Sequence, residues 1–221
     1  MVDAIDLKDY VAGGYFIAKY ATEGFQPSAL LPERVISLSS CIGKPMDVVW
    51  GWDIALYQKE IADFGFRADR LVNFQAWCAE RVPGGISELE GARFAAKEFV
   101  SADTKVVLLG AGLHCELVAE LVKQVPTFAM NDKKSLADGA TSLGFEVLSH
   151  FSHQFSCSWL CSGLEKYMSD VFGIRPNRYG LIDSYAEAKQ VYEWIAEDNM
   201  QGIRAEPLPY FPWLIVQYDV K

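Results

Sequence analysis

The sequence has no complete signature of a familiar enzyme. A G-x-S-x-G nucleophile elbow, an H-E-x-x-H metal motif, a paired-carboxylate motif and a G-x-x-x-x-G-K phosphate loop are all missing from its 221 residues. Each of these motifs carries a defined reaction or ligand, so their absence favours a binding or inhibitory protein over an enzyme of common type. The sequence also predicts no cofactor.

Long apolar runs and an export signal are missing too. No stretch approaches the roughly 20 apolar residues that a membrane span requires. The opening MVDAIDLKDY mixes acidic and apolar residues, without a basic segment followed by an apolar one. We therefore expect a soluble, cytoplasmic protein that does not bind a membrane.

Basic residues are scarce relative to acidic ones. The chain has 20 Lys and Arg against 29 Asp and Glu, a formal charge of −9. A protein that binds nucleic acid needs clustered cations to displace counterions from phosphates, so the sequence predicts no nucleic-acid partner. An acidic surface raises the encounter rate with a cationic protein and favours a basic protein partner, although solubility alone also explains the charge. The oligomeric state is left open.

The residue pattern predicts a single domain over residues 1–221. A proline and two glycines meet near 82–86 and mark a weak sub-boundary there. After one strand over 15–20, apolar residues recur at helical spacing over 54–64 and 71–78. The N-terminal portion is therefore expected to be rich in helices.

Strands and helices alternate in the second half of the sequence. The apolar run at 106–109 is typical of a strand buried on both faces of a parallel sheet, and Gly110-Ala111-Gly112 would turn it into a helix, as in half of a βαβ unit. We predict an α/β fold class, a layered α/β domain with a mixed sheet. The remaining predicted elements are a helix from the capping box Ser87-x-x-Glu90 to Val100, a strand at 145–149, a helix over 160–172 closed by Gly173, a helix opened by Ser184-x-x-Glu187 and a strand at 213–220.

Histidines and cysteines gather at His150, His153, Cys157 and Cys161. Two imidazoles and two thiolates are ligands that zinc prefers, but structural zinc sites pair their ligands across a loop, and Cys161 shares a helical stripe with apolar residues. This pattern argues against a metal site. The five cysteines are odd in number and irregularly spaced, which indicates reduced thiols and no disulfide framework.

Cys157 is the candidate nucleophile of this group. It is expected near the N-terminal end of the helix over 160–172, where the helix dipole lowers the pKa of a thiol, with His153 or His150 as the base. The alternative is that both histidines are ordinary hydrogen-bonding residues at a strand end or in a loop. Whether the thiol and an imidazole meet depends on their arrangement in space.

A second candidate site follows the predicted strand at 106–109. Gly110 and Gly112 match the first two glycines of the G-x-G-x-x-G dinucleotide motif, in which the backbone approaches a pyrophosphate at a helix N-terminus. His114 would lie in the first turn of that helix, and Cys115 stands in place of the third glycine. A tight turn between strand and helix also explains both glycines.

Two further groups are candidates for binding. Trp50 and Trp52 flank a glycine before Asp53, and such indoles are common anchors of protein interfaces. The alternative is that Asp53 caps a helix while the indoles cover the edge of the core. In a predicted loop, Arg175 and Arg178 have the geometry to hold a carboxylate or a phosphate, unless they are simply solvated.

These observations lead to one hypothesis and one alternative. The hypothesis is a non-catalytic, acidic protein-interaction or inhibitory protein, of which an immunity protein that neutralises a basic toxin is one example. The alternative is an intracellular enzyme that uses a Cys/His pair, or that binds a small nucleotide-like ligand. Acidity, aromatic groups and missing motifs favour the first.

Overall fold

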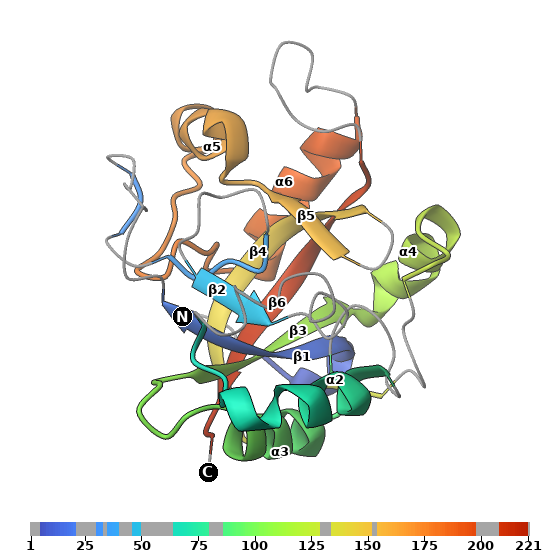
Figure 1. The fold of residues 1–221 in the computed structure, drawn as a ribbon. Helices are drawn as coiled ribbons and strands as arrows, with labels where there is room; N and C mark the ends of the chain where they lie inside the picture. The colour runs from blue at the N-terminus through green and yellow to red at the C-terminus, as the bar shows by residue number, and fades with distance from the viewer. Residues whose placement is uncertain are drawn as a thin grey trace.

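A computed structural model of the chain describes residues 5–20, 30–32, 35–39, 46–49, 64–79, 86–128, 134–151, 154–197 and 208–220. Within these ranges, six strands form one sheet in the order β2-β1-β3-β6-β4-β5 (Figure 1). The strands are β1 (Tyr10–Tyr20), β2 (Met46–Val49), β3 (Val107–His114), β4 (Thr141–Phe151), β5 (Gln154–Ser158) and β6 (Tyr210–Tyr218).

Five α-helices of the described ranges surround this sheet. Helix α3 packs against β1 and β3, and α6 packs against β4 and β6. In the described part of the chain, every helix is too short or too polar to cross a lipid bilayer. The helices are α2 (Leu71–Ala79), α3 (Leu89–Phe99), α4 (Val118–Gln124), α5 (Leu164–Phe172) and α6 (Tyr185–Ala196), with short 3-10 turns η1 (Leu7–Asp9), η3 (Ala68–Arg70), η4 (Cys115–Leu117) and η6 (Cys161–Gly163).

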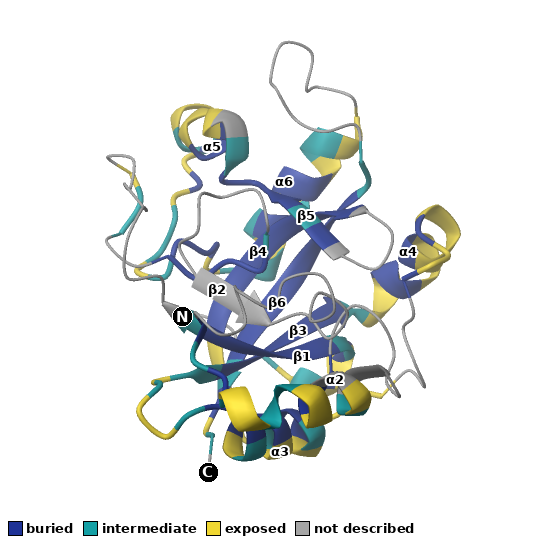
Figure 2. Cartoon of the chain, viewed as in Figure 1, coloured by how far each residue is buried: buried dark blue, intermediate teal, exposed yellow. Residues whose placement is uncertain are grey.

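The predicted mixed sheet is wrong, because every strand pair is antiparallel and the fold is of the α+β kind. The prediction of a helix-rich N-terminal portion is also wrong, since β1 and β2 precede α2. The apolar run at 106–109 suggested a parallel strand because parallel strands are buried on both faces. In this sheet the central antiparallel strands are buried on both faces as well (Figure 2).

Local signals predicted several elements correctly. Helix α2 covers the predicted 71–78, and Gly173 closes α5 in the left-handed conformation. At the start of α6, the Ser184 hydroxyl accepts the Glu187 backbone N–H at 3.2 Å and donates to its carboxylate at 2.8 Å. Glu88 and not Ser87 occupies the N-cap of α3, and it makes no side-chain capping bond. The predicted helix at 54–64 and the sub-boundary at 82–86 lie almost wholly outside the described residues.

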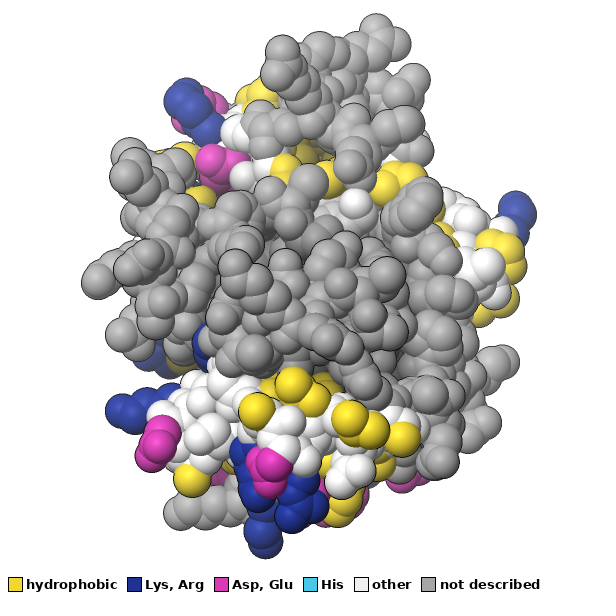
Figure 3. Space-filling view, in the orientation of Figure 1, with side chains coloured by type: hydrophobic (Ala, Val, Ile, Leu, Met, Phe, Trp, Pro, Cys, Tyr) yellow, Lys and Arg dark blue, Asp and Glu magenta, His cyan; other side chains and the backbone are white. Residues whose placement is uncertain are grey.

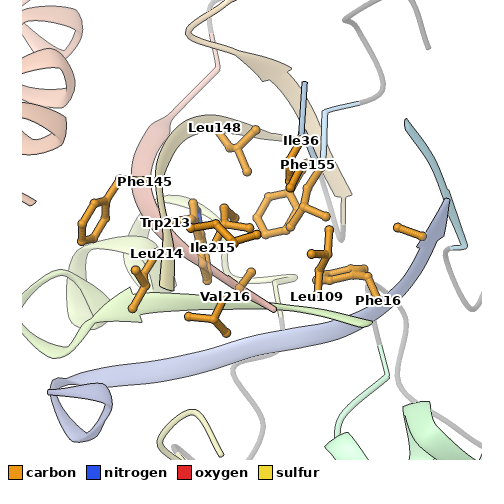
Figure 4. Packing of buried hydrophobic residues seen from close by; sticks show 14 of the residues in the cluster. Phe16, Ile36, Leu109, Phe145, Leu148, Phe155, Trp213, Leu214, Ile215 and Val216 are labelled. Carbon is orange, nitrogen blue, oxygen red and sulfur yellow. The ribbon is translucent and has the colours of Figure 1, made fainter. Parts of the chain in front are cut away.

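Bulges curl the sheet into a half-barrel around an aromatic core. The register shifts in β1 between Ala12 and Gly14 and in β4 between Ser142 and Gly144. Trp213 of β6 is fully buried and packs against Phe155 with ring centroids 5.0 Å apart (Figure 4). Large rings of this kind contribute most of the apolar area that a core buries. The curled sheet thus encloses His150 of β4, which the sequence marked as a candidate base.

Candidate functional site

Cys157 lies in β5, one residue before the strand ends, and not at the start of a helix as predicted. Its side chain is buried, and its backbone N–H donates to the Ser149 hydroxyl at 2.8 Å. A thiol is activated by a helix N-terminus or a nearby cation and by access to solvent. The strand position removes the helix dipole on which the predicted nucleophile depended.

His150 belongs to β4, and aromatic rings from other segments enclose its side chain. Its Nε2 accepts a hydrogen bond from the Trp213 indole at 2.9 Å, whereas its Nδ1 has no hydrogen-bond partner among the described residues. Burial lowers the pKa of this imidazole to about 3, so it is neutral at physiological pH. His150 thus serves as an acceptor for Trp213 and is poorly placed to be a base for Cys157.

The other predicted members of this group do not complete a site within the described residues. His153 lies outside them. Cys161 belongs to η6, is half-buried, and its sulfur accepts the Ser158 backbone N–H at 3.4 Å. In the described part of the chain, no group of three or more His, Cys, Asp or Glu is arranged to hold a metal ion.

A buried carboxyl group, Glu146, escaped the sequence analysis. It has no exposed surface, and it accepts hydrogen bonds from the Ser37 hydroxyl at 2.5 Å and the Leu38 backbone N–H at 3.0 Å. Burial raises its pKa to about 7, although these bonds and one from Ser158 oppose the rise. One sequence signal was present, an acid inside the apolar run Phe145 to Leu148. Glu146 fastens residues 35–39 to the sheet and faces no solvent.

The glycines of the predicted nucleotide turn lie inside β3, and no helix begins there. A Cβ on Gly112 would lie 2.5 Å from the Leu136 side chain, and one on Gly110 would lie 2.9 Å from Tyr218. These close approaches explain why both positions are glycine, and no bound phosphate is needed to account for them. The strand instead ends at His114, which is the N-cap of η4.

His114 belongs to a surface cluster that the sequence did not predict. Pairing of β1 with β3 sets Tyr10 opposite His114, and the start of α6 brings Tyr185 to the same place. The His114 and Tyr185 rings stack with centroids 4.6 Å apart, and Tyr10 meets both rings edge to face. We call Tyr10, His114, Glu116, Tyr185 and Lys189 the β3–α6 cluster.

Glu116 is the charged centre of the β3–α6 cluster. One of its oxygens accepts the Tyr185 hydroxyl at 2.6 Å and the Lys189 ammonium at 3.0 Å. These bonds lower the pKa of Glu116, whereas burial and the nearby carboxylate raise that of Tyr185. At neutral pH the carboxylate is therefore ionised and the phenol protonated. The cluster therefore holds a carboxylate that is fixed in place beside its counter-ion Lys189, and it offers no group poised for proton transfer between Glu116 and Tyr185.

Further acidic side chains are exposed on the surface around the cluster. Burial raises the pKa of Tyr10 to about 12, and the negative charges of Asp9 and Glu116 add to this rise. Glu120 accepts a hydrogen bond from Tyr192 of α6. The negative charge of Glu193 contributes to the raised pKa values of Lys189 and Tyr192. We call Asp9, Glu116, Glu120 and Glu193, with the aromatic rings between them, the acidic surface. Its four acids belong to four different elements, η1, η4, α4 and α6, so the sequence does not show them as a group.

The remaining predicted binding residues are the Trp50–Asp53 group and the two arginines of the loop before α6. Trp50, Trp52 and Asp53 lie outside the described residues. Arg175 and Arg178 are exposed in the loop before α6 and form no ion pair within the described ranges, and the Arg178 guanidinium lies 4.7 Å above the Tyr179 ring. Their binding role stays a prediction.

Thiol reactivity tests whether Cys157 is an activated nucleophile. We expect Cys115, which is exposed, to react with iodoacetamide about 100-fold or more faster than Cys157, because a buried thiol reacts only when the strand opens. Mass spectrometry of peptides after timed labelling measures both rates. The control is the same protein in urea, where the two thiols should react alike. A native Cys157 that reacts faster than its unfolded form would restore the enzyme alternative.

The polar groups described above are thus the β3–α6 cluster at the surface and two buried groups, around Glu146 and His150, inside the fold. Comparisons of the chain with models of protein families, with curated proteins and with solved structures find no match. The assignment of function depends on this geometry.

Proposed function

We propose that this protein is a non-catalytic binding protein that docks a basic protein partner on the acidic surface. The observation that carries the proposal is Glu116, a carboxylate held in place by Tyr185 and Lys189 beside the stacked ring of His114. A side chain fixed before binding loses little conformational entropy when a partner arrives. An immunity protein that neutralises a basic toxin in the cytoplasm is one example of such a binder.

Charge and ring chemistry define the partner. Asp9, Glu120 and Glu193 are exposed around the cluster, and the cation bonded to Glu116 is Lys189. An acidic field steers a cationic protein toward its docking position, and tyrosine rings supply contact area at low entropic cost. The partner surface is therefore expected to present Lys or Arg side chains near apolar groups.

The enzyme alternative has weaker support. Cys157 is buried in a strand, and the Nε2 atom of His150 is occupied by Trp213. Gly110 and Gly112 sit in close contact with side chains of the core, where no phosphate can approach the backbone. Neither predicted chemical site therefore has the geometry that its reaction or ligand requires.

A charge-reversal experiment tests the proposal. The variant D9K/E120K/E193K reverses the acidic surface but leaves Glu116 and its partners intact, and D103K/D138K/D170K makes the same change of charge at exposed positions elsewhere. Each immobilised protein is exposed to extract from the cells that encode it. We expect wild type and the second variant to capture the same basic protein, and the first to retain about a tenth or less of it. Equal capture by both variants would contradict the proposal.

A further inference from the structure

A second surface feature lies where α3 and the C-terminal end of the chain meet, at the opposite end of the molecule from α6 in Figure 1. It is an open depression of about 500 Å³, lined by side chains from the segment before η3, the end of α3, the turn after it and the residues after β6. Small-molecule sites in proteins have volumes of roughly 300–1,000 Å³. The depression is therefore large enough for a small ligand.

Backbone hydrogen bonds fix the walls of this depression. The Arg67 N–H donates to the Phe99 carbonyl at 2.8 Å, and the Ser101 N–H donates to the Gly65 carbonyl at 2.9 Å. The Thr104 N–H closes the next turn on the Ser101 carbonyl at 3.0 Å. Because main-chain bonds set these positions, the pocket exists before any ligand binds.

Its lining combines cations with an apolar wall. Arg67 and Lys97 both line the depression, as does Ser101. Within the described residues, Lys97 has no ion pair, the Ser101 hydroxyl has no hydrogen-bond partner, and Arg67 pairs with the exposed Asp69 at 3.2 Å. The apolar part of the lining consists of Ala96, Val100, Val106 and Val220, with Ala102. Figure 3 shows Lys and Arg side chains gathered beside hydrophobic ones at this end of the molecule.

We propose that this pocket binds a small organic anion. Its phosphate or carboxylate group lies between Arg67 and Lys97 and accepts the Ser101 hydroxyl, and its carbon body packs on the valines. Guanidinium and ammonium groups form strong charge-assisted hydrogen bonds to either headgroup. The site is independent of the acidic surface and of the function proposed for it.

Three probes test the site by titration of the isotope-labelled protein and detection of amide chemical shifts. They are phenyl phosphate, benzoate and inorganic phosphate. We expect phenyl phosphate or benzoate to shift amides around Lys97 and Ser101, and inorganic phosphate to bind several-fold more weakly than phenyl phosphate because it lacks an apolar body. The tighter of the two organic probes identifies the headgroup.

Variants test whether the chemical-shift changes arise from binding in this pocket. R67Q/K97Q should weaken binding of the organic probe about tenfold or more, and D69N should tighten it several-fold, because Asp69 competes for Arg67. The matched control K123Q/K166Q removes two positive charges that are exposed elsewhere and should leave binding unchanged. Shifts spread over many cations, or D69N and R67Q/K97Q both binding like wild type, would overturn the proposal.

Discussion

Replacement of Glu146 by glutamine is expected to stabilise the fold at pH 8 by about 3 kcal/mol and to change its stability little at pH 5. The pKa of this buried carboxyl rises from 4.5 to about 7 on folding. The folded state therefore keeps a proton that the unfolded chain has released, and stability falls as pH rises through that window. Glutamine has no charge to desolvate, and its amide can still accept from Leu38 and donate to Ser37.

Urea unfolding at pH 5 and pH 8, followed by tryptophan fluorescence, measures this difference. Aspartate 138 is exposed, so D138N serves as a control for the loss of one carboxylate and should shift the free energy of unfolding little at either pH. If E146Q were less stable than wild type at pH 8, the ionised carboxylate would be favourable in the core. Its bonds to residues 35–39 would then outweigh the loss of hydration.

In the wild-type protein, His150 is expected to lower the free energy of unfolding by about 3 kcal/mol at pH 4, and replacement by glutamine should remove this loss. The pKa of this histidine falls from 6.5 to about 3 on folding because the ring is buried. Below pH 6.5 the unfolded chain takes up a proton that the folded state excludes, so stability falls as pH falls. A glutamine oxygen can accept the Trp213 indole N–H without this linkage.

The test compares the free energy of unfolding of H150Q and wild type at pH 7 and pH 4. At pH 7 the variant should be somewhat less stable, because the new side chain packs less well among the rings. At pH 4 the order should reverse. An equal loss of stability by both proteins between pH 7 and pH 4 would show that His150 is protonated within the fold.

The two β4 groups act in opposite directions. Between about pH 4.5 and 6.5, acidification favours the folded state through Glu146 and disfavours it through His150. Wild type should therefore show a flatter pH profile than either variant. This balance makes the single variants more informative than the wild-type profile.

Local signals predicted well those elements whose ends are set by a single residue. Gly173 closes α5 and Ser184 opens α6 as expected, since a left-handed cap and a hydroxyl cap depend on near neighbours. Cys157 was misplaced because the apolar spacing after it matched a helix, whereas α5 starts only at Leu164. A short strand before a helix has too few residues for its own period to be recognised.

Long-range features were beyond the sequence. Strand direction depends on how β3, β4 and β6 pair, and burial on both faces is common to parallel and enclosed antiparallel strands. The β3–α6 cluster joins Tyr10, His114 and Tyr185, which are far apart in the chain, so spacing carries no trace of it. Glu146, by contrast, is indicated by the sequence, because it is an acid inside the apolar strand at 145–149.

The central claim is that the acidic surface binds a cationic protein, and the salt dependence of that binding tests it most directly. The dissociation constant for the captured partner is measured between 50 and 500 mM salt for wild type, D9K/E120K/E193K and D103K/D138K/D170K. We expect the first variant to bind about tenfold or more weakly at low salt, with a difference that shrinks as salt rises, while the second follows wild type. A dissociation constant that changes neither with salt nor with charge reversal at Asp9, Glu120 and Glu193 would contradict the claim.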